Sequence, residues 1–186
     1  VIAYYYLCKY GVNTKLIIVD KKIIYEWIFD TYRIDKKNLK YYNDSINLNP
    51  NEWYIDAIFG IGLNKPIKNK YKSIIKDLST CKNIISIDAP SGIFCDTGLS
   101  GNIFVKSKYI LTMNYPKVCY FFNDGYLAYD KYYILDIGLI KVNTNNYIKL
   151  IETSDIESLL PKLSKIDDKY NRGRLLLICG SAGNTG

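Results

Sequence analysis

Hydrophobic positions fall into two patterns that alternate along the chain. Short unbroken runs of β-branched and aromatic residues, bounded by Gly, Pro, Asn or Asp, predict buried strands. Stretches whose apolar residues recur every three or four positions predict amphipathic helices. The predicted strands are 15–20, 53–59, 83–88, 109–113, 118–122 and 132–137, with a short strand and a loop within 37–52. The predicted helices are 1–10, capped by Gly11, then 21–32 and 67–78.

Strands that alternate with helices of crossover length predict a parallel sheet with right-handed connections. We therefore expect an α/β fold: a three-layer, Rossmann-like, mostly parallel sheet with helices on both faces. This first domain is predicted to span residues 1–140. A polar linker at 141–146 and the start of a second α/β domain at 147–186 are predicted to follow.

The predicted second domain has its own element signals. Ser154-Asp-Ile-Glu157 has the spacing of a capping box, which predicts a helix that ends near Pro161. Residues 174–179 form an apolar run that leads directly into a glycine-rich turn. We expect this run to be the first buried strand of that domain.

Composition and charge narrow the classes of partner. The chain of 186 residues is 48% apolar and 23% charged, which is typical of a globular protein. Its net charge of +7 raises the question of nucleic-acid binding, because clustered Lys and Arg bind phosphates. The lysines are instead spread from Lys9 to Lys169, and the densest stretch, 65–76, has the spacing of a helix whose lysines face solvent. We therefore expect a solvated basic surface and no nucleic-acid partner.

The residue types also limit the available chemistry. There is no histidine, which excludes imidazole as acid, base or metal ligand, and the five cysteines contain no C-x-x-C pair. This argues against a zinc cluster or a disulfide framework and favours a reducing compartment, so we expect a cytoplasmic protein. No stretch is apolar for the length that a bilayer requires, so no membrane partner is expected. The chain starts at Val1 inside a predicted helix and stops at Gly186 inside a glycine turn, and we expect both ends to continue in a longer protein.

Two motifs with the same layout carry the candidate chemistry. They are Asp56-Ala-Ile-Phe-Gly-Ile-Gly-Leu-Asn-Lys-Pro66 and Asp88-Ala-Pro-Ser-Gly92, and each follows a predicted strand with an aspartate and a turn rich in Gly and Pro. Ligands of open α/β sheets bind at the carboxyl ends of the strands, so we expect one shared site. Gly60 and Gly62 let backbone N–H groups and the start of a helix approach an anion such as pyrophosphate, and glycine also tolerates positive φ. The same two glycines also suit any tight turn between a strand and a helix.

The acidic residues suggest how such a site would work. Asp56 lies in an apolar run, where an ionised carboxylate costs several kcal/mol unless it is paired or bound to a cation. Its alternative role is to cap a neighbouring loop. Without histidine or a cysteine pair, a cation would be a hard one held by oxygen atoms. Asp88, with the Ser91 hydroxyl nearby, suits general acid–base catalysis or binding of sugar hydroxyls.

The order and spacing of these motifs, followed by Asp96-Thr-Gly98 and Tyr133-Ile-Leu-Asp-Ile-Gly138, resemble the NAD(P)H-hydrate epimerase domain, also called the YjeF N-terminal domain. The segment Lys169-Tyr-x-x-Gly173-Arg-Leu-Leu-Leu-Ile-Cys-Gly180-Ser-x-Gly-x-Thr-Gly186 resembles the start of the ribokinase-like, ADP/ATP-dependent NAD(P)H-hydrate dehydratase. Many bacteria fuse the two in this order. The resemblance implies repair of hydrated NADH and NADPH: the epimerase interconverts the R and S forms, and the dehydratase converts the S form back to NADH or NADPH with ADP or ATP and Mg²⁺, at sites outside these residues.

The resemblance also implies residue roles. Asp56 and Ser91 match potassium ligands, and Asp88 matches a substrate-binding aspartate, which is our candidate for acid–base catalysis. The family's substrate-binding loop corresponds to Gly60, Ile61, Gly62, Leu63, Asn64, Lys65 and Pro66. Relatives often dimerise, so this protein is a candidate homo-oligomer.

The chain also departs from the family pattern. The family's Asn-Gly-Gly-Asp-Gly loop would precede Val1, so these residues alone are expected to be inactive. Asn184 stands where the dehydratase has methionine. The alternatives to an isomerase are a non-catalytic module of the same fold, which binds a nucleotide or another protein, and a degenerate product of a compositionally biased genome.

Overall fold

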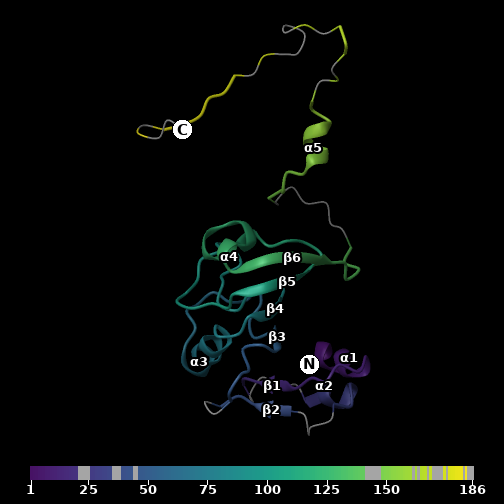
Figure 1. Ribbon diagram of the computed structural model, residues 1–186, viewed down its shortest axis with the longest axis vertical. Helices are drawn as coiled ribbons and strands as arrows, with labels where there is room; N and C mark the ends of the chain where they lie inside the picture. Colours follow the sequence, from purple (N-terminus) through teal and green to yellow (C-terminus); the bar gives the residue numbers. More distant parts are fainter. Residues whose placement is uncertain are drawn as a thin grey trace. The chain divides into compact units, whose positions relative to one another are not determined.

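The computed structural model describes residues 1–20, 26–34, 39–43, 46–140, 148–160, 162, 164–166, 168, 174, 176–181 and 183. The chain divides into two compact units, Val1–Val142 and Asn143–Gly186 (Figure 1). The first unit contains all the strands of the described part of the chain, and the second contains one short helix.

The first unit is built on parallel strands. β1 (Leu16–Ile18) pairs with β2 (Leu39–Tyr41), and a separate four-stranded sheet has the order β3-β4-β5-β6. The four strands are β3 (Trp53–Asp56), β4 (Asn83–Ile87), β5 (Ser107–Met113) and β6 (Tyr129–Leu135). Every pairing among the described strands is parallel, as predicted. The single sheet that we expected is instead hydrogen-bonded as two.

The helices of the first unit agree only partly with the prediction. They are α1 (Ile2–Lys9), α2 (Glu26–Thr31), α3 (Asn69–Leu78), the 3₁₀ helix η3 (Val118–Phe121) and α4 (Asn123–Leu127). α1 is confirmed, and Gly11 after it has a φ of +78°, the left-handed conformation that glycine supplies at helix ends. α2 lies within the predicted helix 21–32, of which residues 21–25 are outside the described part. α4 was not predicted.

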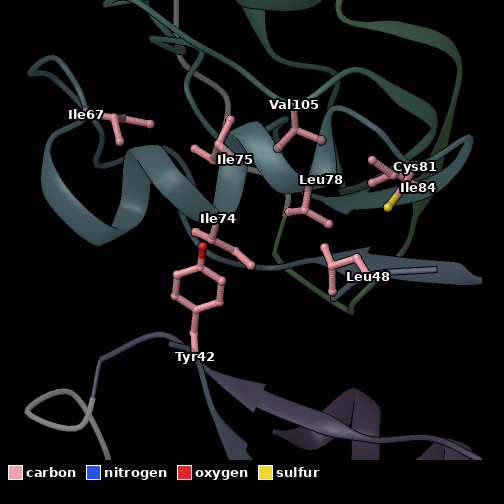
Figure 2. Close-up of a cluster of buried hydrophobic side chains, with 9 residues drawn as sticks. All are labelled: Tyr42, Leu48, Ile67, Ile74, Ile75, Leu78, Cys81, Ile84 and Val105. Atoms are coloured by element: carbon pink, nitrogen blue, oxygen red, sulfur yellow. The ribbon is translucent and has the colours of Figure 1, made fainter. Parts of the chain in front are cut away.

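The main core is formed where α3 packs on the sheet (Figure 2). Ile74, Ile75 and Leu78 of α3 are buried there against Ile84 of β4. Each side chain of this size contributes about 1.5–3 kcal/mol on burial, so this stripe is a major source of stability. The lysines of the α3 segment lie on its exposed side, as predicted: Lys68, Lys70, Lys72 and Lys76.

The same core links α3 to the two-stranded sheet. Ile17 and Val19 pack against it from β1 and the residue that follows. The Tyr42 hydroxyl, which points at α3 in Figure 2, donates a hydrogen bond to Asp77 Oδ2 at 2.7 Å. On the other face of β1, Leu16 and Ile18 pack against α1 and α2 in a separate cluster around Tyr4, Phe29 and Ile34. Helices therefore cover both faces of β1–β2, which confirms the three-layer arrangement there.

The four-stranded sheet has one face that the described helices leave open. Trp53 stacks on Tyr109 with ring centroids 6.1 Å apart, and Tyr109 meets Tyr133 at 5.8 Å. The side chains of Trp53 and Ile55 are 54% and 42% exposed. The predicted buried strand 53–59 is therefore wrong in two respects: it ends at Asp56, and Asp56 is its only buried residue. The reason is that β3 lies at the edge of this sheet and the described residues cover only one of its faces.

The predicted strand 118–122 is also wrong. Residues Val118–Phe121 form η3, in which the consecutive residues Cys119 and Tyr120 are both buried. A strand would direct these two side chains to opposite faces, whereas the 3₁₀ turn places both in a cluster with Ala89, Ile93 and Ile110. A short apolar run has no periodicity that separates a strand from a buried helical turn.

The second unit corrects two further predictions. α5 (Thr153–Glu157) is the predicted helix, but its capping box is formed by Glu152 and Asp155, and it ends at Glu157. Pro161 lies outside the described residues. Residues 174 and 176–179 form no strand, and the side chains of Leu176, Leu177 and Ile178 are 72–90% exposed. A buried strand needs neighbours on both sides, and no strand of this unit is among the described residues.

No helix in the part of the chain that the structure describes is long and apolar enough to cross a bilayer.

Candidate functional site

The two aspartate motifs meet at one edge of the four-stranded sheet. β3 and β4 are parallel neighbours, with Asp56 paired in register with Ser86, so their carboxyl ends lie side by side. Asp56 at the end of β3 accepts two hydrogen bonds from Ser91 of the second motif. The backbone N–H of Ser91 donates to Oδ2 at 2.8 Å, and its hydroxyl donates to Oδ1 at 2.6 Å. The structure thus brings together two residues that are 35 positions apart.

Asp56 is buried inside a network of hydroxyl groups. Its side chain is 1% exposed, and Ser86 Oγ donates to Oδ2 at 2.7 Å. Ser107 Oγ lies 2.5 Å from Ser86 Oγ and extends the network. Burial raises the pKa of Asp56, and hydrogen bonds from Ser91, Ser86 and the N–H of Ile58 oppose that rise. No lysine or arginine of the described chain forms an ion pair with Asp56, so an ionised carboxylate here has hydrogen bonds and no positive partner.

Three groups lie close to Ser91 Oγ, and two of them are oxygen atoms. It accepts a hydrogen bond from the N–H of Phe59 at 2.9 Å, and it lies 3.5 Å from the Phe59 carbonyl oxygen. The Asp56 carboxylate is its third neighbour. Carboxylate, hydroxyl and carbonyl oxygens are the ligands of hard cations. Among the described residues, no group of three or more Cys, Asp or Glu side chains has the arrangement of a metal site.

Asp88 lies just beyond the end of β4 in a constrained backbone conformation. Its φ is +67°, in the left-handed region that costs a residue other than glycine about 1–2 kcal/mol. The Asp88 N–H donates to the Leu111 carbonyl at 2.8 Å, and the Tyr120 hydroxyl donates to the Asp88 carbonyl. Burial raises the pKa of Tyr120, so this hydroxyl keeps its proton and remains a donor. These two bonds on either side of the residue hold the strained conformation in place.

The Asp88 carboxylate is accessible, whereas that of Asp56 is not. The Asp88 side chain is 19% exposed. One of its oxygens, Oδ2, faces the first motif, because a Cβ built on Gly60 would lie 3.8 Å from it. Asp88 is therefore the carboxylate of the pair that a ligand beside Gly60 can touch.

Lys117 is a residue of this site that the sequence analysis missed. Its Nζ lies 2.8 Å from Asp88 Oδ1 in a partly buried ion pair. The sequence contained a signal for it: Pro116-Lys117 follows β5, whose carboxyl end lies at the same edge of the parallel sheet as those of β3 and β4. The prediction of a strand at 118–122 instead left this lysine just before a buried strand, with no role in the site.

Residues 60–66, which we call the glycine loop, are mostly open to solvent. Six of the seven are exposed, and Leu63 is the half-buried one, packed against the α3 core. Neither Gly60 nor Gly62 has a positive φ, so left-handed backbone is not why glycine stands there. A Cβ on Gly62 would meet no atom within 4 Å, which leaves the backbone of the loop open to a ligand. Gly92 differs: its φ is +110°, and a Cβ there would lie 2.2 Å from the Ile103 carbonyl oxygen.

Known proteins resemble this chain in sequence. The bifunctional NAD(P)H-hydrate repair enzyme Nnr of Dictyoglomus turgidum is 34% identical over 149 residues, which is 77% of this chain and 29% of the relative. The NAD(P)H-hydrate epimerase of Limosilactobacillus fermentum is 39% identical over 64 residues, which is 34% of this chain and 31% of the relative. The chain thus spans less than a third of the length of either relative.

A solved structure shares the fold. The crystal structure of yeast ynu0, YNL200c, superposes with a TM-score of 0.57 over 72% of this chain and 58% of that chain. The sequence identity is 18%, so this likeness concerns the fold, which is Rossmann-like α/β as predicted. A family model described as YjeF-related protein N-terminus matches residues 6–119, more than half of the chain, including both aspartate motifs. The chain therefore belongs to the family of YjeF-related protein N-termini.

Proposed function

We propose that this protein is an NAD(P)H-hydrate epimerase, an isomerase that interconverts the R and S forms of hydrated NADH or NADPH. One observation carries the proposal: the accessible carboxylate of Asp88 faces the glycine loop, next to the buried Asp56–Ser91 pair. Family membership supports it, since curated relatives have epimerase or repair-enzyme names.

Asp88 is the proposed acid–base residue. A carbon loses its configuration when one of its bonds breaks and regains either configuration when the bond re-forms. Protonation of the hydroxyl oxygen by Asp88 would let the C–O bond break with its electron pair on oxygen, giving water. Addition of water to the opposite face, with return of the proton to Asp88, would complete the exchange. General acid–base catalysis of this kind contributes about 10²–10⁴-fold to a rate.

The glycine loop is the proposed substrate-binding segment. The backbone around Gly62 is open, and the loop leads to α3, which begins at Asn69. Backbone N–H groups in such a turn suit the pyrophosphate of a dinucleotide. The exposed side chain of Lys65 adds a positive charge close by.

A potassium ion is the proposed cofactor, with Asp56 and Ser91 as ligands. The donor set fits, because the Asp56 carboxylate is buried without a positive partner in the described chain and the Ser91 hydroxyl lies close to a carbonyl oxygen. A bound cation would neutralise that carboxylate. Without a bound cation, Asp56 and Ser91 tie the end of β3 and Phe59, the residue before the glycine loop, to the turn that carries Asp88.

We further propose that the full-length protein couples this reaction to dehydration of the S form, with ADP or ATP and Mg²⁺ as cofactors. The bifunctional name of the Dictyoglomus turgidum relative supports this. The experiment is to add S-hydrate, ADP or ATP and Mg²⁺ to the full-length protein and follow recovery of the absorbance of the reduced nicotinamide ring. Absence of nucleotide-dependent recovery would contradict the coupling.

The epimerase proposal is tested by incubating purified R-hydrate with the full-length protein and measuring the R to S ratio over time. We expect the wild type to equilibrate the two forms and Asp88→Asn to lose at least about 100-fold in rate, because Asn cannot transfer the proton. Lys106→Met, a change at an exposed residue, is the control and should retain the wild-type rate. A folded Asp88→Asn variant with an unchanged rate would exclude Asp88 as acid or base. A wild type that binds the hydrate without epimerising it would favour a non-catalytic module.

A further inference from the structure

Lys117 lies in the turn that follows β5 and was not among the site residues predicted from the sequence. Its side chain is 22% exposed, and its Nζ is 2.8 Å from Asp88 Oδ1. The same nitrogen lies 3.2 Å from Thr112 Oγ1, 3.2 Å from the Tyr115 carbonyl oxygen and 3.4 Å from that of Met113. It therefore has four oxygen neighbours from this chain alone.

These neighbours decide what Lys117 can do. An ammonium group has three N–H donors and no acceptor, so four protein oxygens already take up its hydrogen-bonding capacity. Thr112 is itself fixed, because its hydroxyl donates to the Tyr115 carbonyl at 2.8 Å. Lys117 thus has no donor left for a substrate phosphate.

Lys117 completes the restraint of Asp88. The backbone of Asp88 is already fixed by Leu111 on one side and Tyr120 on the other. The freedom that remains is rotation of the carboxyl group about the side-chain bonds. The ion pair to Oδ1 removes that rotation and leaves Oδ2 facing Gly60.

We propose that Lys117 is a positioning residue, which acts through Asp88 by holding Oδ1 so that Oδ2 points at the substrate beside the glycine loop. The expected effect on kcat rests on the proposed function, whereas the expected orientation of the Asp88 carboxyl group does not. Misplacement of a catalytic group by about 1 Å costs on the order of 100-fold in rate, and this is the scale of effect expected here.

The kinetic test is a double-mutant cycle in the full-length protein with Lys117→Met, Asp88→Asn and the combined variant. We expect Lys117→Met to lower kcat about 100-fold with little change in KM, and Lys117→Arg to recover most of kcat because arginine keeps the charge and the donors. Since Lys117 acts only through Asp88, adding Lys117→Met to Asp88→Asn should cost nothing more. Lys106→Met is the matched control.

Two kinetic outcomes would overturn the inference. One is a Lys117→Met variant with the kcat of the wild type. The other is a combined variant whose loss is the product of the two single losses, because that result would mean that Lys117 acts on the substrate independently, for example through a phosphate. A rise in KM without a fall in kcat would lead to the same conclusion.

A structural test separates this inference from the proposed function. Crystal structures of the wild type, Lys117→Met and Lys117→Arg without substrate should show Asp88 Oδ2 facing Gly60 in the wild type and in Lys117→Arg, and turned away in Lys117→Met. An unchanged Asp88 carboxylate in Lys117→Met would overturn the inference even if the wild type proved to be inactive. An inactive wild type with the expected carboxylate shift would refute the epimerase proposal alone.

Discussion

At the scale of single residues, two aspartates at neighbouring strand ends have different surroundings, and the roles that we propose for them differ accordingly. Asp56 is 1% exposed and accepts hydrogen bonds from two serines, so it can hold the turns together or hold a cation but cannot touch a substrate. Asp88 is 19% exposed and paired with Lys117 on one oxygen, so its other oxygen is available for chemistry. The sequence identified both aspartates, because an acidic residue at the end of an apolar run is a local signal. The burial of Asp56 was expected from its place in an apolar run, whereas the partial exposure of Asp88 depends on the packing around it and was not predictable.

The raised pKa of Asp56 leads to a prediction about pH and potassium. Burial gives the Asp56 carboxyl a higher pKa in the folded protein than in the unfolded chain. At pH values between these two pKa values, the unfolded chain has lost the proton while the folded protein still holds it. The free energy of unfolding therefore falls as pH rises through this window. In potassium-free buffer, the stability of Asp56→Asn relative to the wild type should therefore increase from pH 4 to pH 7. Added KCl should raise the melting temperature of the wild type more at pH 7 than at pH 4, because a cation binds the ionised form. A cation at ten times its Kd adds about 1.4 kcal/mol to stability.

Choline chloride at equal ionic strength is the control for that measurement, and Asp56→Asn should not respond specifically to KCl. An equal response of the wild type and Asp56→Asn to KCl, or the same response to choline chloride, would count against a potassium site at Asp56.

Ser91 should matter for stability as well as for the site. Its hydroxyl donates to Asp56 and accepts from the Phe59 N–H, so Ser91→Ala leaves a buried carboxylate with one donor fewer and an N–H without this acceptor. We expect a loss of about 1.5–3 kcal/mol in the free energy of unfolding, measured by urea denaturation. Ser79→Ala, at an exposed serine after α3, should change stability by less than about 0.5 kcal/mol. Equal effects of the two substitutions would show that the Asp56 network contributes little.

At the scale of elements, most strands were predicted correctly from the sequence, but the residues that cover each apolar run were not. β4, β5 and β6 and the apolar stripe of α3 follow from local patterns and are confirmed. The 3₁₀ helix at Val118–Phe121 and the exposed face of β3 were not predictable, because which neighbours cover an apolar run is decided by residues far away in the sequence. Lys117 was missed because its partner Asp88 is far away along the chain, so no local pattern links the two residues.

The two turns at the ends of β3 and β4 use glycine for different reasons, which gives a matched pair of substitutions. Gly92→Ala would place a methyl group 2.2 Å from the Ile103 carbonyl oxygen at a φ of +110°, so we expect a clear fall in melting temperature. Gly62→Ala meets no atom within 4 Å and should leave the melting temperature nearly unchanged. If the glycine loop binds substrate through its backbone, Gly62→Ala should raise KM several-fold. A destabilised Gly62→Ala, or a stable Gly92→Ala, would contradict this division.

At the scale of the whole molecule, the first unit carries the candidate site, and its family is the one that the motifs indicated. The family was predictable because several motifs agree in order and spacing over residues 56–98. The second unit was less predictable: its helix is confirmed, but its expected strand is absent from the described residues. An apolar run becomes a buried strand only when neighbouring strands accept its hydrogen bonds and helices cover it.

We propose that the turns after β3 and β4 form one binding site for a hydrated nicotinamide nucleotide. The decisive measurement is a crystal structure of the full-length protein with hydrated NADH bound. We expect the hydrated ring within hydrogen-bonding distance of Asp88 Oδ2 and the pyrophosphate against the backbone of the glycine loop. A ligand bound away from Asp88, with the glycine loop unoccupied, would contradict it.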